Sequence, residues 1–222
     1  MIKAIFLKEW YKTRMAFFVS LALCLVMAIY ALLRINRLIE LKGVEHLWMI
    51  MLLKDNTFID LIKYTPLVAG ALIGFAQMAP EMVQKRLKLT LHLPFPQMRM
   101  IGLMLTTGVC QLFVIFAIQA SVIAIYYHSI LPGELVSRVM FTELPWYFAG
   151  FIAYLFASAI CLEGTWPRRV VLALLAVAAL IICFLQPAPE AYNGIAWMLI
   201  VFIFLLTLLA IGSVLRFKEG LQ

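Results

Sequence analysis

Charged side chains are scarce in this sequence. Only 13% of its 222 residues are Asp, Glu, Lys or Arg, about half the share found in soluble globular domains, which is about 25%. Apolar residues make up 65% of the chain, and the mean hydropathy is +1.03. This composition excludes an ordinary soluble domain and favours a protein that is embedded in a lipid bilayer.

Residues that commonly bind metals or catalyse reactions are also few. The three histidines lie outside the apolar runs or at their edges, which argues against a bis-histidine haem or a serine-histidine protease within the membrane. The cysteines stand singly and without metal-ligand spacing, so we interpret them as packing residues: Cys24, Cys110, Cys161 and Cys183. The pattern G-x-x-x-x-G-K-[S/T] of a phosphate-binding loop is absent from the sequence.

Long apolar runs without charge are what the sequence does contain. A helix needs about 20 mostly apolar residues to cross the hydrocarbon core, and the runs lack the alternation of barrel strands. We therefore predict an all-α polytopic membrane protein, a bundle of six transmembrane helices with an N-terminal interfacial helix. The spans are expected near 15–33, 64–80, 100–127, 144–162, 170–186 and 195–215.

The first 14 residues form a basic amphipathic stretch, MIKAIFLKEWYKTR. Its pattern predicts a helix in the inner membrane interface, with Trp10 and Tyr11 at headgroup depth. The alternative is a simple basic flank that anchors the first span. We expect no cleavage of the first apolar run, because no small-residue cleavage site follows it, so residues 1–222 form a single transmembrane domain.

The distribution of basic residues predicts the orientation of the chain. With both termini in the cytoplasm, 12 of the 18 basic residues lie on the inner side, as the positive-inside rule requires. These are Lys3, Lys8, Lys12, Arg14, Lys85, Arg86, Lys88, Arg99, Arg168, Arg169, Arg216 and Lys218. The outer segments carry the acids Glu40, Glu45, Asp55, Asp60, Glu134, Glu143 and Glu190. Dispersed basic residues of this kind do not indicate a nucleic-acid surface. We expect a polytopic protein of the plasma (inner) membrane.

A basic, proline-ended segment separates the second and third runs, Pro80 to Met100. Leucines alternate with polar residues from Leu87 to Leu93, a pattern that alone predicts a strand. A lone strand would lack a partner in a helical bundle, so we favour a short helix with two apolar faces, ended by Pro94 and Pro96. The plainer alternative is a basic connector, which does not explain the leucines.

The N-terminal K-E-W-Y-K-T-R stretch, the six spans and this loop together resemble the permease subunits of exporter-type ABC transporters, the type-2 integral-membrane class. The family loop commonly reads E-x-x-x-G-T-L-E-x-L-x-x-L-P, whereas Leu89 stands here at the glycine position. The residues that match its skeleton are Glu81, Thr90, Leu91, Leu93 and Pro94.

The resemblance implies that ATP and Mg are bound in a partner subunit, a cytoplasmic ABC ATPase, and that this chain is no enzyme and needs no cofactor. A second permease chain, identical or related, would complete the translocation path. Residues 84–97 would form the cytoplasmic coupling loop. The residues implied in coupling to the partner are Glu81, Gln84, Lys85, Arg86, Lys88, Leu89, Thr90, Leu91, Leu93 and Pro94.

Polar residues inside the spans offer two interpretations. Thr107, Gln111 and Gln119 lie near one face of the third span and could line a path between subunits. More often, such groups hydrogen-bond neighbouring helices. Gly70 and Gly74 form a small-xxx-small pair, which predicts a close helix contact.

Two further functional classes stay open at this stage. A secondary carrier usually places ionisable groups deep in the membrane, whereas Lys63, Glu81 and Glu163 lie near span ends. We expect Glu163 to pair with Arg168 or Arg169 at the inner surface. The other class is a non-transporting membrane scaffold or sensor. The sequence does not identify a substrate, although an amphipathic or lipid-like molecule would suit an exporter of this kind.

Overall fold

The computed structural model describes residues 2–53, 57–83, 97–186 and 188–218, and these residues form a helical bundle without strands. Six of the helices are long and apolar enough to cross a membrane, as the sequence predicts. The elements, in chain order, are α1 (Ile2–Lys42), α2 (Val44–Leu53), the 3-10 helix η1 (Asp60–Ile62), α3 (Thr65–Val83), α5 (Gln97–His128), α6 (Gly133–Leu162), α7 (Trp166–Phe184) and α8 (Ala196–Lys218).

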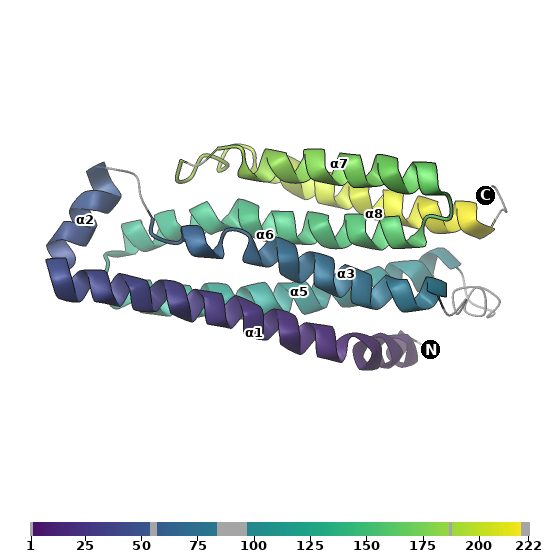
Figure 1. Ribbon diagram of the computed structural model, residues 1–222, viewed down its shortest axis with the longest axis horizontal. Helices are drawn as coiled ribbons and strands as arrows, with labels where there is room; N and C mark the ends of the chain where they lie inside the picture. The colour runs from purple at the N-terminus through teal and green to yellow at the C-terminus, as the bar shows by residue number, and fades with distance from the viewer. Residues whose placement is uncertain (1, 54–56, 84–96, 187, 219–222) are drawn as a thin grey trace.

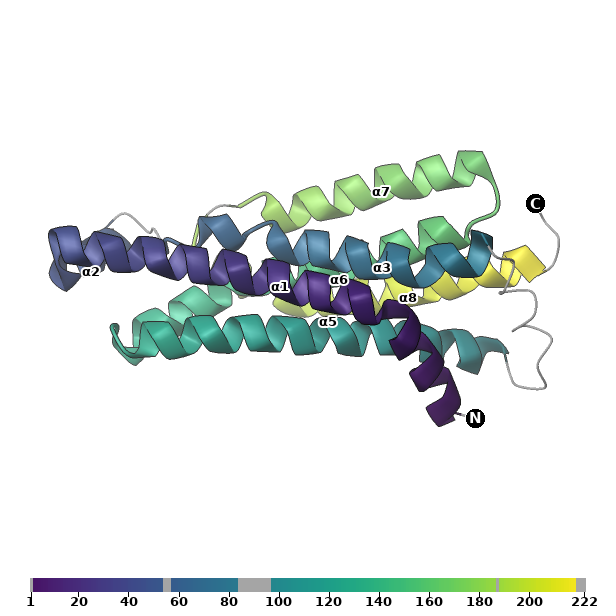
Figure 2. The ribbon, with the colours of Figure 1, turned by 60° about the horizontal axis from the view of Figure 1, so that its bottom comes forward.

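Helix α1 joins the predicted interfacial segment and the first span in one element of 41 residues. At 1.5 Å per residue it is about 60 Å long, twice the thickness of the hydrocarbon core. Its N-terminal part is bent out of line with the rest (Figure 2). In the N-terminal part of α1 the Thr13 hydroxyl donates a hydrogen bond to the carbonyl oxygen of Glu9, 2.9 Å away, a contact that often accompanies bends in helices.

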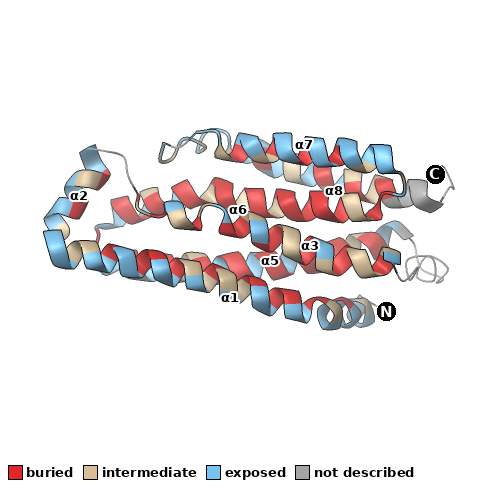
Figure 3. Cartoon of the chain, in the orientation of Figure 1, coloured by how far each residue is buried: buried red, intermediate tan, exposed pale blue. Residues whose placement is uncertain are grey.

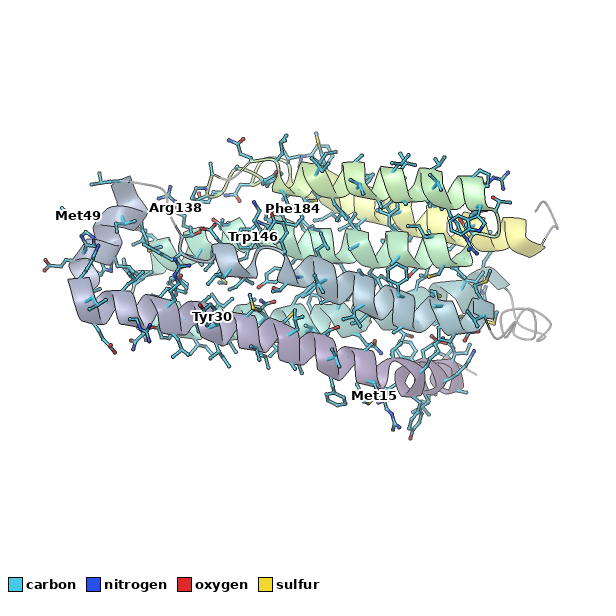
Figure 4. The ribbon with its side chains drawn as sticks, in the orientation of Figure 1. Met15, Tyr30, Met49, Arg138, Trp146 and Phe184 are labelled. Atoms are coloured by element: carbon cyan, nitrogen blue, oxygen red, sulfur yellow. The ribbon has the colours of Figure 1, made fainter. Side chains whose placement is uncertain are left out.

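Helix α6 forms the centre of the bundle. Figure 3 shows it buried along most of its length, with α7 largely exposed beside it. Helices α3, α5, α7 and α8 all pack against α6, whereas α1 packs against α3 and α5. The exposed surfaces of α1, α7 and α8 are rich in large apolar side chains, as expected where lipid replaces water. Met15, for example, is 70% exposed and points away from the bundle (Figure 4).

The contact between α3 and α6 depends on glycine, which confirms the predicted close approach of Gly70 and Gly74. A Cβ atom at Gly70 would overlap the backbone oxygen of Gly150. At Gly74, a Cβ atom would lie 2.8 Å from the backbone oxygen of Tyr154. Neither glycine could therefore carry a Cβ atom without a clash, and the two backbones meet directly at these positions.

One end of the bundle is closed by α2, which turns across it (Figure 1). Leu47 and Met51 of α2 are buried there against residues of α1, α5 and α6. Arg138 of α6 donates a hydrogen bond from a guanidinium nitrogen to the backbone oxygen of Met51, 3.3 Å away; Figure 4 shows Arg138 between these two elements. The segment therefore caps the bundle.

The opposite end gathers the segments that the basic residues assign to the inner side. The beginning of α1, the end of α3, the α6–α7 connection and the end of α8 all lie there (Figure 1). The fold thus agrees with a topology in which both termini share one side of the membrane. Which side that is remains a prediction from the positive-inside rule.

Candidate functional site

The most polar buried region lies at this inner end, where α1, α3, α5 and α6 meet. At its centre is Glu81, on the last turn of α3, whose side chain is fully buried. One of its carboxylate oxygens, Oε1, lies 3.0 Å from the Nζ of Lys8 and 2.9 Å from the Nζ of Lys12. Because both lysines belong to the N-terminal part of α1, these ion pairs tie that part of α1 to the end of α3.

A second buried carboxylate completes the charge balance. Glu9 is fully buried, and its Oε2 lies 2.7 Å from the Nζ of Lys12. Lys12 thus bridges the two carboxylates, with a side chain that is only 11% exposed. Two carboxylates and two ammonium groups make the cluster formally neutral, which is how charges are retained in low-dielectric surroundings.

Neutral polar groups extend the cluster across the bundle. The Gln77 amide nitrogen donates to Glu9 Oε2 at 2.9 Å and to the backbone oxygen of Met104 at 2.7 Å. The Tyr154 hydroxyl, from α6, donates to Gln77 Oε1 at 2.7 Å. Gly108 of α5 leaves the space for this contact, since a Cβ atom there would lie 2.6 Å from Gln77 Oε1. We refer to Lys8, Glu9, Lys12, Gln77, Glu81 and Tyr154 as the inner cluster.

The sequence indicates only part of the inner cluster. The sequence predicts a partner contact for Glu81, and Gln77 is a polar residue within the second predicted span, whereas no motif sets Glu9 or Tyr154 apart. The spacing of Gln77 and Glu81, four residues apart, does place them on one helix face. Their partners come from other helices, and no spacing within one helix reveals which helices pack together.

Of the residues implied in coupling to an ATPase, Glu81 is the one that the structure describes. It faces the interior of its own chain, bound to α1. The others, Gln84, Lys85, Arg86, Lys88, Leu89, Thr90, Leu91, Leu93 and Pro94, lie outside the described residues, and their role stays a prediction. The segment that contains them starts directly after α3, three residues beyond Glu81.

The three candidate path-lining residues each form a hydrogen bond within the chain. Thr107 donates to the backbone oxygen of Leu103 at 2.8 Å, one turn earlier in α5. Gln111 donates to the Thr13 hydroxyl of α1 at 2.7 Å, and Gln119 lies 3.4 Å from the Thr65 hydroxyl of α3. The contacts of Gln111 and Gln119 are hydrogen bonds between helices, the commoner of the two interpretations, whereas the Thr107 bond stays within α5.

A buried carboxyl group that the sequence placed in an outer segment lies inside the bundle instead. Glu143 is within α6, which starts 11 residues before the charge-free run from Leu144, and its side chain is fully buried. Its Oε2 accepts a hydrogen bond from the Tyr147 hydroxyl at 2.7 Å. Its Oε1 has no hydrogen-bond partner among the described residues. Buried acids of this kind are expensive in a membrane and often functional.

The predicted ion pair at Glu163 is present. A guanidinium nitrogen of Arg168 lies 3.7 Å from Glu163 Oε1, and the Arg169 Nε donates to the Glu163 backbone oxygen at 2.7 Å. Together these contacts stabilise the turn between α6 and α7. Within the described part of the chain, His, Cys, Asp and Glu side chains form no group of three that could hold a metal ion.

Comparison of the chain with protein-family models, with curated proteins and with solved structures finds no match. The features of this chain that point to a function are therefore its own: the inner cluster, the buried Glu143 and the sequence pattern of residues 84–97.

Proposed function

We propose that this chain is the membrane-spanning permease subunit of an ATP-driven ABC transporter of the exporter type. It lies in the plasma (inner) membrane with both termini in the cytoplasm. A separate ATPase subunit hydrolyses ATP, and a second permease chain completes the translocation path. The substrate is unassigned, and an amphipathic or lipid-like molecule suits the class.

The observation that carries this proposal is the link between α1 and α3 that the two ion pairs of Glu81 form. A coupling loop must pass its displacement to the transmembrane helices. Residues 84–97 follow α3 directly, and Glu81 links the last turn of α3 to Lys8 and Lys12 on α1. A pull on the loop therefore either moves α1 and α3 together or breaks two ion pairs. Transmission between distant sites requires an element with two arrangements, and in this proposal the ion pairs of Glu81 are the contacts that differ between them.

The test is purification of the chain from its native membrane in a mild detergent, with ATP hydrolysis as the readout. We expect an ATPase subunit to accompany the wild-type chain, and the chain freed of it to be inactive. In the variant Leu89→Ala with Leu91→Ala, we expect the ATPase to be lost, because each buried leucine contributes about 1.5 to 3 kcal/mol.

A matched variant controls for general damage to the loop. Lys85→Gln with Lys88→Gln changes the same segment but keeps the leucines, so the ATPase should remain bound. Both variants are compared at equal amounts of permease in the membrane. Full retention of the ATPase by the leucine variant would remove the basis for a coupling loop. ATP hydrolysis by the chain alone would contradict the whole proposal.

A secondary carrier is the second candidate, and Glu143 is the observation that favours it. A fully buried carboxyl group with one tyrosine partner is typical of the proton and ion sites of carriers. Reconstitution of the chain alone into vesicles separates the candidates. A flux of protons or cations that needs no ATP and is abolished by Glu143→Gln would favour the carrier over the permease.

A further inference from the structure

The bend in α1 creates a groove on the lipid-facing side of the bundle. The groove has a volume of about 390 Å³ and lies between the N-terminal part of α1 and the first half of α5. This volume falls within the range of small-molecule sites, about 300 to 1,000 Å³. Its lining is mostly apolar and includes Leu7, Trp10 and Phe17 of α1, with Cys110 and Val114 of α5.

The groove crosses the expected boundary of the hydrocarbon core. Arg14 is the last charged residue before the run from Met15 to Leu33. Trp10 lines the groove on the headgroup side of Arg14, and Phe17 lines it on the hydrocarbon side. A ligand that fills the groove therefore has one part at headgroup depth and another among the acyl chains.

Positive charge flanks the groove on the same face of α1. Lys3 precedes Leu7 by four residues, and Arg14 follows Trp10 by four residues, so all four side chains lie on one side of the helix. Both Lys3 and Arg14 are exposed. Each basic residue near an anionic membrane surface contributes about five-fold to binding.

From the apolar lining, the position at the boundary and the two cations, we propose that the groove binds one anionic phospholipid of the inner leaflet. One acyl chain lies along Phe17, Cys110 and Val114, and the phosphate lies within reach of Lys3 or Arg14.

A second copy of the chain fits this groove less well. In a two-fold symmetric dimer the same patch is used by both copies, so two copies of Lys3 and two of Arg14 would lie in one interface. Like charges brought together in low-dielectric surroundings repel strongly. An anionic headgroup, by contrast, is attracted by the same two side chains.

The experiment uses the full chain in detergent, without any ATPase, so that it is independent of the proposed transport function. Dioleoyl phosphatidylglycerol and dioleoyl phosphatidylcholine are titrated separately, and bound lipid is counted by native mass spectrometry. We expect phosphatidylglycerol to bind more tightly, and Lys3→Gln with Arg14→Gln to weaken it by about 25-fold, five-fold for each cation. The control variant, Arg34→Gln with Arg37→Gln, removes two exposed charges of α1 far from the groove and should bind normally.

Two further measurements place the lipid in the groove. Cys110→Trp fills the groove and should abolish tight binding, whereas Ile125→Trp, at an exposed position of α5 outside the groove, should not. Phosphatidylglycerol with brominated acyl chains should quench the fluorescence of Trp10, and Trp10→Phe should remove that part of the quenching.

Three results would overturn the proposal. The first is equal affinity for the two lipids, and the second is unchanged binding by Cys110→Trp. The third is a Cys110 to Cys110 crosslink formed at high yield in the wild-type chain, which would show that a second copy covers the groove.

Discussion

The ammonium group of Lys12 lies 2.9 Å from the Oε1 of Glu81, and this contact joins residues that are 69 positions apart in the sequence. It brings the N-terminal part of α1 against the last turn of α3. Because Lys12 also binds Glu9 at 2.7 Å, its position depends on both carboxylates. The inner cluster is therefore one coupled network.

Removing the charge of Glu81 should destabilise the protein. In Glu81→Gln, Lys8 and Lys12 lose a buried partner, and we expect a loss of about 3 kcal/mol in the free energy of unfolding. This is the lower end of the range for broken buried pairs, because the Lys8 side chain is 39% exposed. The measurement is unfolding in mixed detergent micelles. The double variant Glu81→Gln with Lys12→Gln should recover part of the loss, since it leaves Glu9 and Lys8 as a balanced pair. Equal losses in the single and double variants would contradict a direct Glu81–Lys12 interaction.

Glu143 should behave in the opposite way, because no described cation binds it. Replacing both members of a buried polar pair with apolar groups of similar shape is often neutral or stabilising. We expect Glu143→Met with Tyr147→Phe to unfold at the same temperature as the wild type or at a higher one. Tyr147→Phe alone should destabilise by about 1 to 3 kcal/mol, because it leaves the carboxyl group without its donor. A loss of transport in the stable double variant would show that the pair serves function. A large loss of stability in the double variant would instead assign the pair a structural role.

The glycine contact between α3 and α6 gives a third prediction. Gly70→Ala should destabilise the bundle by about 1 to 3 kcal/mol, the usual cost of overpacking, because the added methyl group would overlap the Gly150 backbone. Gly102→Ala on α5 is the matched control, since a Cβ atom there has no neighbour within 4 Å. That control should gain about 0.5 to 1 kcal/mol from its better helix propensity. Thermal unfolding of both variants in one detergent checks the pair. Similar shifts for both would argue against the tight contact.

The fourth prediction concerns orientation. In a variant without native cysteines, single cysteines are placed at Ser137, at the capped end, and at Thr90, in the predicted coupling loop. An impermeant thiol reagent added to intact cells should label Ser137→Cys and leave Thr90→Cys unlabelled until the membrane is opened. The positive-inside rule is the physical reason, because the segments at the inner end carry most of the basic residues. Labelling of Thr90→Cys alone would invert the topology.

The sequence by itself determined the class of the protein and the number of its spans. In lipid every backbone N–H and C=O group needs a hydrogen-bond partner within the protein. Long charge-free runs that lack the alternation of barrel strands can meet this requirement only as helices. This local requirement also made the contact at Gly70 and the ion pair at Glu163 predictable, because each depends on residues close together in the chain or on one helix face. The helices nevertheless extend beyond the charge-free runs: α1 continues to Lys42, and α6 begins at Gly133.

Only the tertiary structure decided which polar groups meet. Glu9 belongs to a stretch that reads as a surface helix, yet packing of α1 on α3 buries it beside Gln77 and Lys12. Glu143 reads as an outer acid because it precedes a charge-free run, whereas the preceding turns of α6 carry it inside. Hydropathy along a chain measures the cost of exposing each residue to lipid. Hydropathy does not reveal which helices pack together, because that depends on how the side chains of separate segments fit against one another.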